Sequence, residues 1–127
     1  MGKLSNANVL VIDKDIFARH SLADDLASYS ATVRMAHGIE DATELMRKSE
    51  FDAIVFDVNL VQDEFRKLFN KTNKHSDNKP IFIVYSSLAN INRRALACPE
   101  IFRIFVKPCN TNGIVDSIYM HLNKTRA

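Results

Sequence analysis

The chain has 127 residues, a length that fits one domain with a single core. Apolar residues make up 46% of it and the formal net charge is +2, which excludes a disordered chain and gives no electrostatic argument for a nucleic-acid partner. No apolar run approaches the roughly 18 residues of a membrane span, and the first residues lack the apolar stretch of a secretory signal. We therefore expect a cytoplasmic protein that is one domain over residues 1–127, with no membrane association and no output domain.

Patterns typical of buried strands alternate along the chain with patterns typical of amphipathic helices. Strands are expected over residues 8–12, 31–36, 51–56, 81 to 84 or 85, and 101–106. The helical stripes between and after them consist of Ala18, Leu22, Leu26 and Tyr29; Ile39, Ala42, Leu45 and Met46; Val61, Phe65, Leu68 and Phe69; residues 88–97; and Val115, Ile118, Tyr119 and Leu122. Five strands alternating with five helices predict an α/β fold, a parallel sheet with helices on both faces.

Polar side chains stand where the expected strands end. Asp13 follows the first strand, Asp57 the third and Lys107 the fifth, while the fourth ends near Ser86. In a parallel sheet the carboxyl ends of neighbouring strands meet in one crevice. A carboxylate can attack a phosphoryl group, a lysine can bind its oxygens as a point charge, and a hydroxyl can donate a further hydrogen bond. The pattern indicates a phosphoryl-acceptor site with Asp57 as the nucleophile.

These segments resemble the receiver domain of two-component response regulators, over nearly the whole chain. The resemblance is carried by Val9-Leu10-Val11-Ile12-Asp13, by Phe51-Asp52-Ala53-Ile54-Val55-Phe56-Asp57 and by Phe105-Val106-Lys107-Pro108. It implies a flavodoxin-like sheet in the order 2-1-3-4-5. It also implies a phosphohistidine donor on a sensor histidine kinase or phosphotransfer protein, and no enzyme activity beyond slow self-phosphorylation and self-dephosphorylation.

The same resemblance assigns roles to single residues. Asp57 would be the phosphoacceptor, Asp13 an acidic pocket residue, and Lys107 and Ser86 the groups that bind the phosphoryl oxygens. Three further positions carry expectations: the backbone carbonyl of Asn59 would ligate a metal, Pro108 would follow a cis peptide, and the switch hydroxyl would fall at Ser86 or Tyr85. A downstream protein would dock on the face formed by residues 88–122, from Leu88 to Leu122.

The sequence departs from the family pattern at several of these positions. Lys14 occupies the place of the second pocket acid, and Asp15, one residue further, either caps the next helix or turns inward as a ligand. The residue at the aromatic switch position is Ile104, and its neighbour Phe105 is expected to be buried. Because an ammonium repels a divalent cation and cannot replace its coordination, we expect weak Mg²⁺ binding and slow phosphorylation of Asp57 or none. The alternative is that Lys14 points into solvent.

Two other functions fit parts of the pattern. A degenerate receiver would keep the fold and bind its partners without phosphorylation. A phosphatase of the haloacid-dehalogenase type would use Asp13 of the Asp13-Lys14-Asp15 segment as nucleophile, with Ser86 and Lys107 in support. That family needs a further acidic motif after the lysine, and only Asp116 follows Lys107, inside an expected helix.

Overall fold

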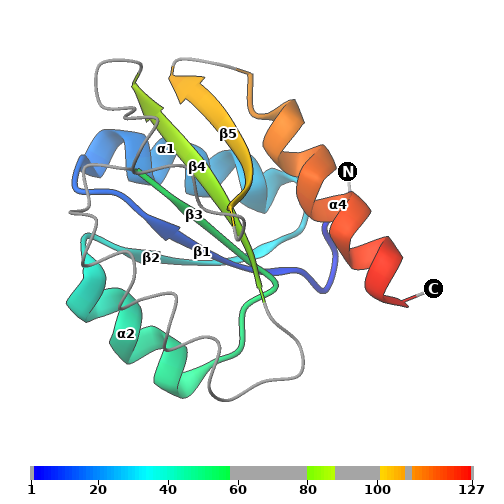
Figure 1. The fold of residues 1–127 in the computed structure, drawn as a ribbon, viewed down its shortest axis with the longest axis horizontal. Coiled ribbons are helices and arrows are strands. Elements are labelled where there is room, and N and C mark those ends of the chain that lie inside the picture. Colours follow the sequence, from blue (N-terminus) through cyan, green and yellow to red (C-terminus); the bar gives the residue numbers. More distant parts are fainter. Residues whose placement is uncertain (1, 58–79, 88–100, 108–109, 127) are drawn as a thin grey trace.

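A computed structural model describes residues 2–57, 80–87, 101–107 and 110–126. Five strands form one parallel sheet in the order β2-β1-β3-β4-β5, which confirms the predicted order (Figure 1). The strands are β1 (Asn8–Ile12), β2 (Thr32–Ala36), β3 (Ala53–Phe56), β4 (Ile81–Ser87) and β5 (Ile101–Lys107). The described helices are α1 (Ile16–Ser28), α2 (Ile39–Lys48) and α4 (Asn112–Arg126). The two helices expected around residues 61–69 and 88–97 lie outside the described residues.

Alternation along the strands divides the core into two layers. Val9 and Val11 of β1 pack in one layer with buried residues of α1 and α4, and Leu10 and Ile12 pack in the other, against which α2 packs. Because successive side chains of a strand point to opposite faces, a wholly apolar strand needs cover on both sides. The helices provide this cover, with α1 and α4 on one face of the sheet and α2 on the other.

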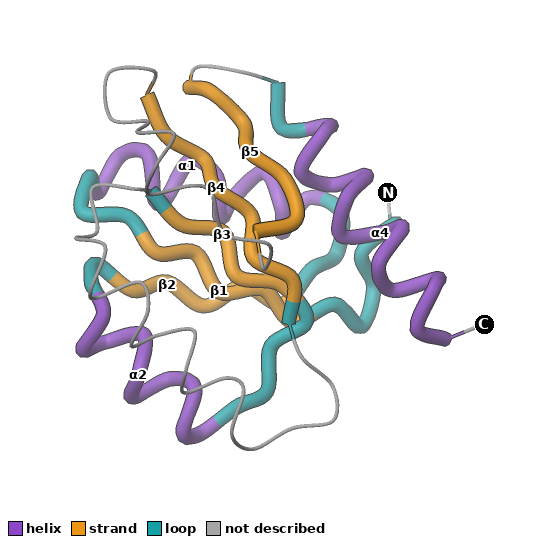
Figure 2. Tube along the Cα trace, in the orientation of Figure 1, coloured by secondary structure: helices purple, strands orange, loops and turns teal. Residues whose placement is uncertain are grey.

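The strands that carry the site extend beyond their apolar runs. β4 continues to Ser87, past the expected end at residue 84 or 85, because Ser86 and Ser87 pair with Val106 and Lys107 of β5. Backbone pairing continues into polar residues, whereas an apolar pattern stops at them. The carboxyl ends of the strands therefore bring polar side chains to one edge of the sheet, where the loops after β1 and β2 also lie (Figure 2).

Two parts of the expected core lie on the surface. The pattern of residues 101–106 predicts a buried strand, but Phe102, Ile104 and Val106 of β5 are exposed. Tyr119 of α4 is 38% exposed, so its predicted place on the buried helical face is wrong. Its ring lies 4.9 Å from Nζ of Lys3, which also donates to Oδ1 of Asp116 at 2.5 Å. The amino-terminal segment thus runs beside α4, as Figure 1 shows, and the helical spacing of Tyr119 gave no sign of this contact. Within the described part of the chain, no helix is long and apolar enough to cross a membrane.

Candidate functional site

Asp57 lies directly after β3, at the carboxyl edge of the sheet. Its backbone N–H donates to the carbonyl of Ile12 at 3.1 Å, which extends the pairing of β1 and β3 by one step. The residue is buried, with 7% of its surface exposed. Its Oδ1 accepts a hydrogen bond from Oγ of Ser86 at 3.0 Å, and its Oδ2 accepts one from Nζ of Lys107 at 2.8 Å. Side chains from three neighbouring strands therefore meet at this carboxylate.

Asp13 is the second carboxylate of the site, and each of its polar groups has a partner. Its backbone N–H donates to Ala36 at 3.1 Å, and its carbonyl accepts from Nη1 of Arg19 at 2.8 Å. Its Oδ1 accepts from the backbone N–H of Asp15 at 2.9 Å, and its Oδ2 accepts from Nζ of Lys107 at 2.5 Å. These contacts fix Asp13 to β2, to α1, to its own loop and to β5.

Lys107 joins the two carboxylates. Its side chain is 18% exposed, and those of Asp13 and Asp57 are 10% and 8% exposed. Burial by itself lowers the pKa of Lys107, but the hydrogen bonds to Asp13 and Asp57, together with their charges, outweigh it and raise the pKa above its ordinary value. The ring of Tyr85 lies 5.3 Å from the same ammonium. The ammonium is therefore held charged between two acidic groups and beside an aromatic ring.

Asp15 caps helix α1. Its Oδ1 accepts from the backbone N–H groups of Phe17 at 2.9 Å and Ala18 at 3.4 Å, with the extended backbone typical of an N-cap residue. The sequence left two roles for Asp15, a helix cap or an inward-turned ligand, and in the structure its side chain caps the helix. Its carboxylate satisfies the first turn of α1 and stands apart from the contacts of Asp13 and Asp57.

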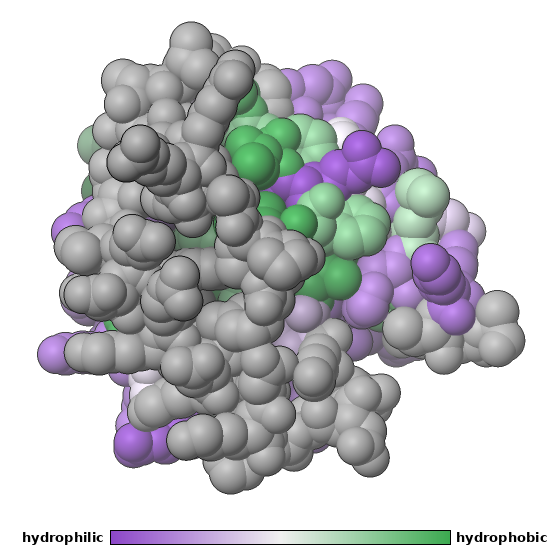
Figure 3. Space-filling view, viewed as in Figure 1, coloured by the Kyte–Doolittle hydropathy of each residue, from purple (hydrophilic) through white to green (hydrophobic). Residues whose placement is uncertain are grey.

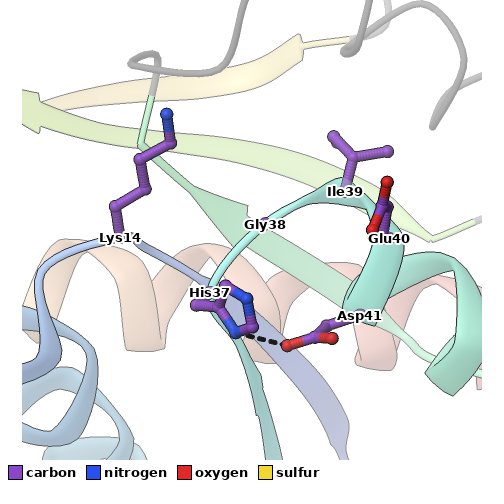
Figure 4. Close-up of a pocket in the computed structure, with 6 residues that line it drawn as sticks. All are labelled: Lys14, His37, Gly38, Ile39, Glu40 and Asp41. Carbon is purple, nitrogen blue, oxygen red and sulfur yellow. Dashed lines mark ion pairs between the residues drawn. The ribbon is translucent and has the colours of Figure 1, made fainter.

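Lys14 is exposed, and within the described ranges it forms no ion pair. It borders an open hollow of about 300 Å³ between the end of β1 and the start of α2, whose other lining residues are His37, Gly38, Ile39, Glu40 and Asp41. Figure 4 shows its side chain pointing away from His37 and Asp41, which pair with each other. This exposure agrees with the alternative in which Lys14 points into solvent.

The remaining predicted positions are the two candidates for the switch hydroxyl, the two residues near the aromatic switch position, and the residues after β3 and β5. Ser86, which is fully buried, is the hydroxyl that contacts Asp57, whereas Tyr85 turns its ring toward Lys107. Ile104 of β5 is 43% exposed. Figure 3 shows hydrophobic surface over the part of the molecule where Figure 1 draws β5. Phe105 is partly buried against the core beside α4. Asn59 and Pro108 lie outside the described residues.

Two contacts at the site have no signal in the sequence pattern. Arg19 lies on the helix that follows Asp13, and its position in the sequence is typical of a surface residue. Its guanidinium nevertheless donates a hydrogen bond to the Asp13 carbonyl. Tyr85 reads as a strand residue, yet its ring borders the lysine. Both contacts depend on how neighbouring elements are placed, and a single-sequence periodicity does not contain that information.

The donor set bears on whether a divalent cation would bind strongly. Hard divalent cations prefer several oxygen ligands, commonly carboxylates. Among the described residues, no group of three or more His, Cys, Asp or Glu side chains gathers in a way that could hold a metal ion. The two carboxylates at the sheet edge share one ammonium, and the third nearby, Asp15, caps α1. The described residues do not fit a strong divalent-cation site.

Neither a protein-family model nor a curated protein matches the sequence. Solved structures do match the fold. A two-component response regulator from Clostridium difficile aligns with a TM-score of 0.78 at 18% identity, over 95% of this chain and 99% of that one. The chain has the receiver-domain fold.

Two further structures with the receiver-domain fold extend the comparison. A response regulator receiver domain protein from Clostridium thermocellum aligns with a TM-score of 0.77 at 17% identity, over 94% of this chain and 97% of that one. A response regulator protein from Burkholderia pseudomallei aligns with a TM-score of 0.70 at 21% identity, over 95% of this chain and 73% of that one. The latter structure holds a phosphorylated aspartic acid and a calcium ion.

Proposed function

We propose that this chain is a phosphoacceptor receiver domain in two-component or phosphorelay signalling, with Asp57 as the residue that accepts the phosphoryl group. One observation carries the proposal: the Asp57 carboxylate lies at the carboxyl edge of the sheet, with the Ser86 hydroxyl on one oxygen and the Lys107 ammonium on the other. The receiver-domain fold supports it, as does the phosphorylated aspartic acid of the Burkholderia pseudomallei protein.

The proposed reaction moves a phosphoryl group from a phosphohistidine nitrogen to a carboxylate oxygen of Asp57. The P–N bond breaks, a P–O bond forms, and the donor histidine recovers the electron pair on its nitrogen. Two anionic groups must approach each other, so a nearby cation lowers the electrostatic cost. Lys107 supplies that cation, and Ser86 can donate to a phosphoryl oxygen once the carboxylate is occupied. The protein would otherwise have no enzyme activity of its own beyond slow self-phosphorylation and self-dephosphorylation.

Mass spectrometry after incubation with acetyl phosphate tests this role directly. The wild-type chain should gain the mass of one phosphoryl group, lost again on treatment with hydroxylamine, and Asp57→Asn should gain none. Asp24→Asn, which changes an exposed carboxylate on α1, is the matched control and should behave like the wild type. Modification that persists in Asp57→Asn would contradict the proposal.

We further propose that Mg²⁺ binds weakly to this site. Lys14 stands where the family places a second acid, Asp15 is engaged at the helix, and Lys107 contacts both remaining carboxylates. A Mg²⁺ titration followed by amide NMR should saturate only at high concentration, and Lys14→Asp should bind more tightly. Saturation of the wild type well below millimolar Mg²⁺ would refute this.

The partners follow from the same role. The donor would be a sensor histidine kinase or a phosphotransfer protein, and a downstream protein would dock on the face from Leu88 to Leu122. The described part of that face includes a row of exposed apolar residues on β5, namely Phe102, Ile104 and Val106. Alternate positions on a strand share a face, so these side chains form one stripe.

A degenerate receiver that binds partners without phosphorylation is the second candidate. The observation in its favour is that Lys107 already forms ion pairs with both Asp13 and Asp57, so these contacts hold the pocket together without a phosphoryl group. Beryllofluoride separates the two candidates, because an adduct at Asp57 with NMR changes around Ser86 supports a switch. Partner binding that is unchanged by the adduct, and retained in Asp57→Asn, supports the degenerate receiver.

A further inference from the structure

The ammonium of Lys107 has three described neighbours of two different kinds. Two are carboxylates, with Nζ 2.5 Å from Oδ2 of Asp13 and 2.8 Å from Oδ2 of Asp57. The third is the ring of Tyr85, whose centroid lies 5.3 Å from Nζ, inside the range of a cation–π interaction. The lysine side chain is mostly buried, so little water competes with the ring for the ammonium.

We propose that Tyr85 is a positioning residue whose ring holds the Lys107 ammonium between Asp13 and Asp57. Attraction to the two carboxylates is the stronger effect, since hydrogen bonds between ionised groups exceed a cation–π contact in energy. Attraction to the carboxylates does not by itself select one conformation of the lysine side chain, which has a flexible four-carbon stem. The Tyr85 ring restricts the Lys107 ammonium on one side, so the ammonium stays on the side of the two carboxylates.

Strand register explains why Tyr85 occupies this place. In the pairing of β4 with β5, Tyr85 is opposite Phe105 and Ser87 is opposite Lys107. Tyr85 is therefore two residues away from the partner of Lys107, on the same face of the sheet. Neighbouring strands lie about 4.8 Å apart and two residues along a parallel strand span about 6.6 Å, so an aromatic and a long side chain can meet across this diagonal. The contact is set by the sheet itself.

The consequence for Asp57 rests on the proposed function. When Asp57 carries a phosphoryl group, the ammonium must contact the new oxygens from the same direction. A ring that limits the motion of Lys107 keeps it ready for that contact, and such preorganisation lowers the cost of binding an oxyanion. Loss of the ring should weaken oxyanion binding at Asp57 while leaving both carboxylates in place.

The experiment measures Lys107 itself, in protein without phosphoryl group or partner. Side-chain NMR of the lysine ammonium reports its pKa and the exchange rate of its protons. Tyr85→Leu should lower the pKa of Lys107 and speed proton exchange by about five-fold, the size of effect expected from one cation–π contact. Tyr85→Phe keeps the ring and should behave like the wild type. The affinity for beryllofluoride should fall in Tyr85→Leu and recover in Tyr85→Phe.

The chain offers a matched control in Tyr119, whose ring lies 4.9 Å from the ammonium of Lys3. Tyr119→Leu should change the Lys3 signals and leave those of Lys107 unaltered. A wild-type Lys107 signal in Tyr85→Leu would overturn the proposal, and so would equal changes in Tyr85→Leu and Tyr85→Phe, which would assign the effect to the hydroxyl.

A measurement on the wild type covers the case in which Tyr85→Leu does not fold. The ring current of Tyr85 should move the ε-methylene protons of Lys107 upfield, and ordinary shifts for these protons would contradict the proposal. The NMR readouts on Lys107 require no ligand at Asp57, so a chain whose Asp57 never accepts a phosphoryl group would refute the proposed function and leave these readouts intact. The beryllofluoride measurement alone depends on the proposed function.

Discussion

Two lysines of this protein have the same kinds of neighbours in different surroundings. Lys3 contacts the carboxylate of Asp116 and the ring of Tyr119, and Lys107 contacts two carboxylates and the ring of Tyr85. The side chains of Lys3 and Asp116 are 38% and 57% exposed, whereas that of Lys107 is 18% exposed. The two clusters therefore separate the effect of the contacts from the effect of burial.

The pKa of both lysines is raised, but the balance behind the shift differs. At Lys3 the hydrogen bond to Asp116 is the leading cause, and burial opposes it less. At Lys107 burial is the largest single effect and lowers the pKa, and the hydrogen bonds and charges of Asp13 and Asp57 together outweigh it. Water can replace any partner of Lys3, but it has little access to Lys107. The same contacts are thus optional at the surface and required at the sheet edge.

The largest expected effect is at Lys107. Lys107→Met leaves the carboxylates of Asp13 and Asp57 close together without their shared cation, and removal of one partner from a buried ion pair costs about 3 kcal/mol or more. Urea denaturation near pH 7 should show this loss. A loss below about 1 kcal/mol would mean that solvent screens this cluster as it screens the one at Lys3.

The pH dependence sharpens the same comparison. The pKa of Lys107 is raised in the folded protein, so its contribution to stability is complete below its ordinary value of 10.5. The contribution is lost as the pH rises through the raised folded value, where the ammonium loses its proton. The stability difference between the wild type and Lys107→Met should be constant from about pH 7 to 10 and should shrink above that range. A difference that shrinks below pH 9 would contradict the raised pKa.

Ser86→Ala should have an intermediate effect. It removes the hydroxyl that donates to Oδ1 of Asp57 from a fully buried position, and a buried acceptor that loses its donor costs about 1–2 kcal/mol. Urea denaturation measures the loss, and Ser28→Ala, on the exposed end of α1, is the control. Equal stability of the two variants would show that Asp57 does not depend on Ser86.

Asp15→Ala should cost about 1 kcal/mol, because it removes the N-cap of α1. Its second readout distinguishes a cap from a ligand. If Asp15 acts at the helix end alone, the variant loses thermal stability and its Mg²⁺ titration matches that of the wild type. A lower Mg²⁺ affinity in Asp15→Ala would show that the Asp15 carboxylate is among the cation ligands.

The smallest expected effect is at Lys3, where Lys3→Met should leave the urea midpoint unchanged within error. The contacts of Lys3 are exposed, and exposed ion pairs contribute little to stability. A clear loss in Lys3→Met would remove the contrast between the two clusters and would show that the amino-terminal segment stabilises α4.

The sequence predicted the sheet because burial on both faces leaves a direct trace in it. Wholly apolar runs such as residues 9–12 and 53–56 indicate covered strands, and their alternation with helical stripes predicts a parallel sheet. The strand order came from the resemblance to receiver domains and not from the spacing. The end of β4 was less predictable, since Ser86 and Ser87 continue the strand through backbone pairing alone. The helical spacing predicts that Tyr119 lies in the core, but this spacing does not show that the ring stays partly exposed beside Lys3.

The candidate site, like the sheet, could be predicted only in part from the sequence. Asp13 and Asp57 stand just after their strands and Lys107 is the last residue of β5, and topology alone brings such positions together. The contacts of Arg19 and Tyr85 were not predictable, because they join residues of different elements without any periodic signal. The choice between Ser86 and Tyr85 needed the register of β4 against β3, which the sequence left open.

The saturation of Asp13 limits what a single substitution can achieve at this pocket. Its backbone and both carboxylate oxygens are engaged by Ala36, Arg19, Asp15 and Lys107. An acid introduced at position 14 adds an oxygen donor but leaves the competing ammonium in place. A tight cation site would therefore also need the Lys107 ammonium to leave Asp13, so Lys14→Asp should strengthen Mg²⁺ binding without making it tight.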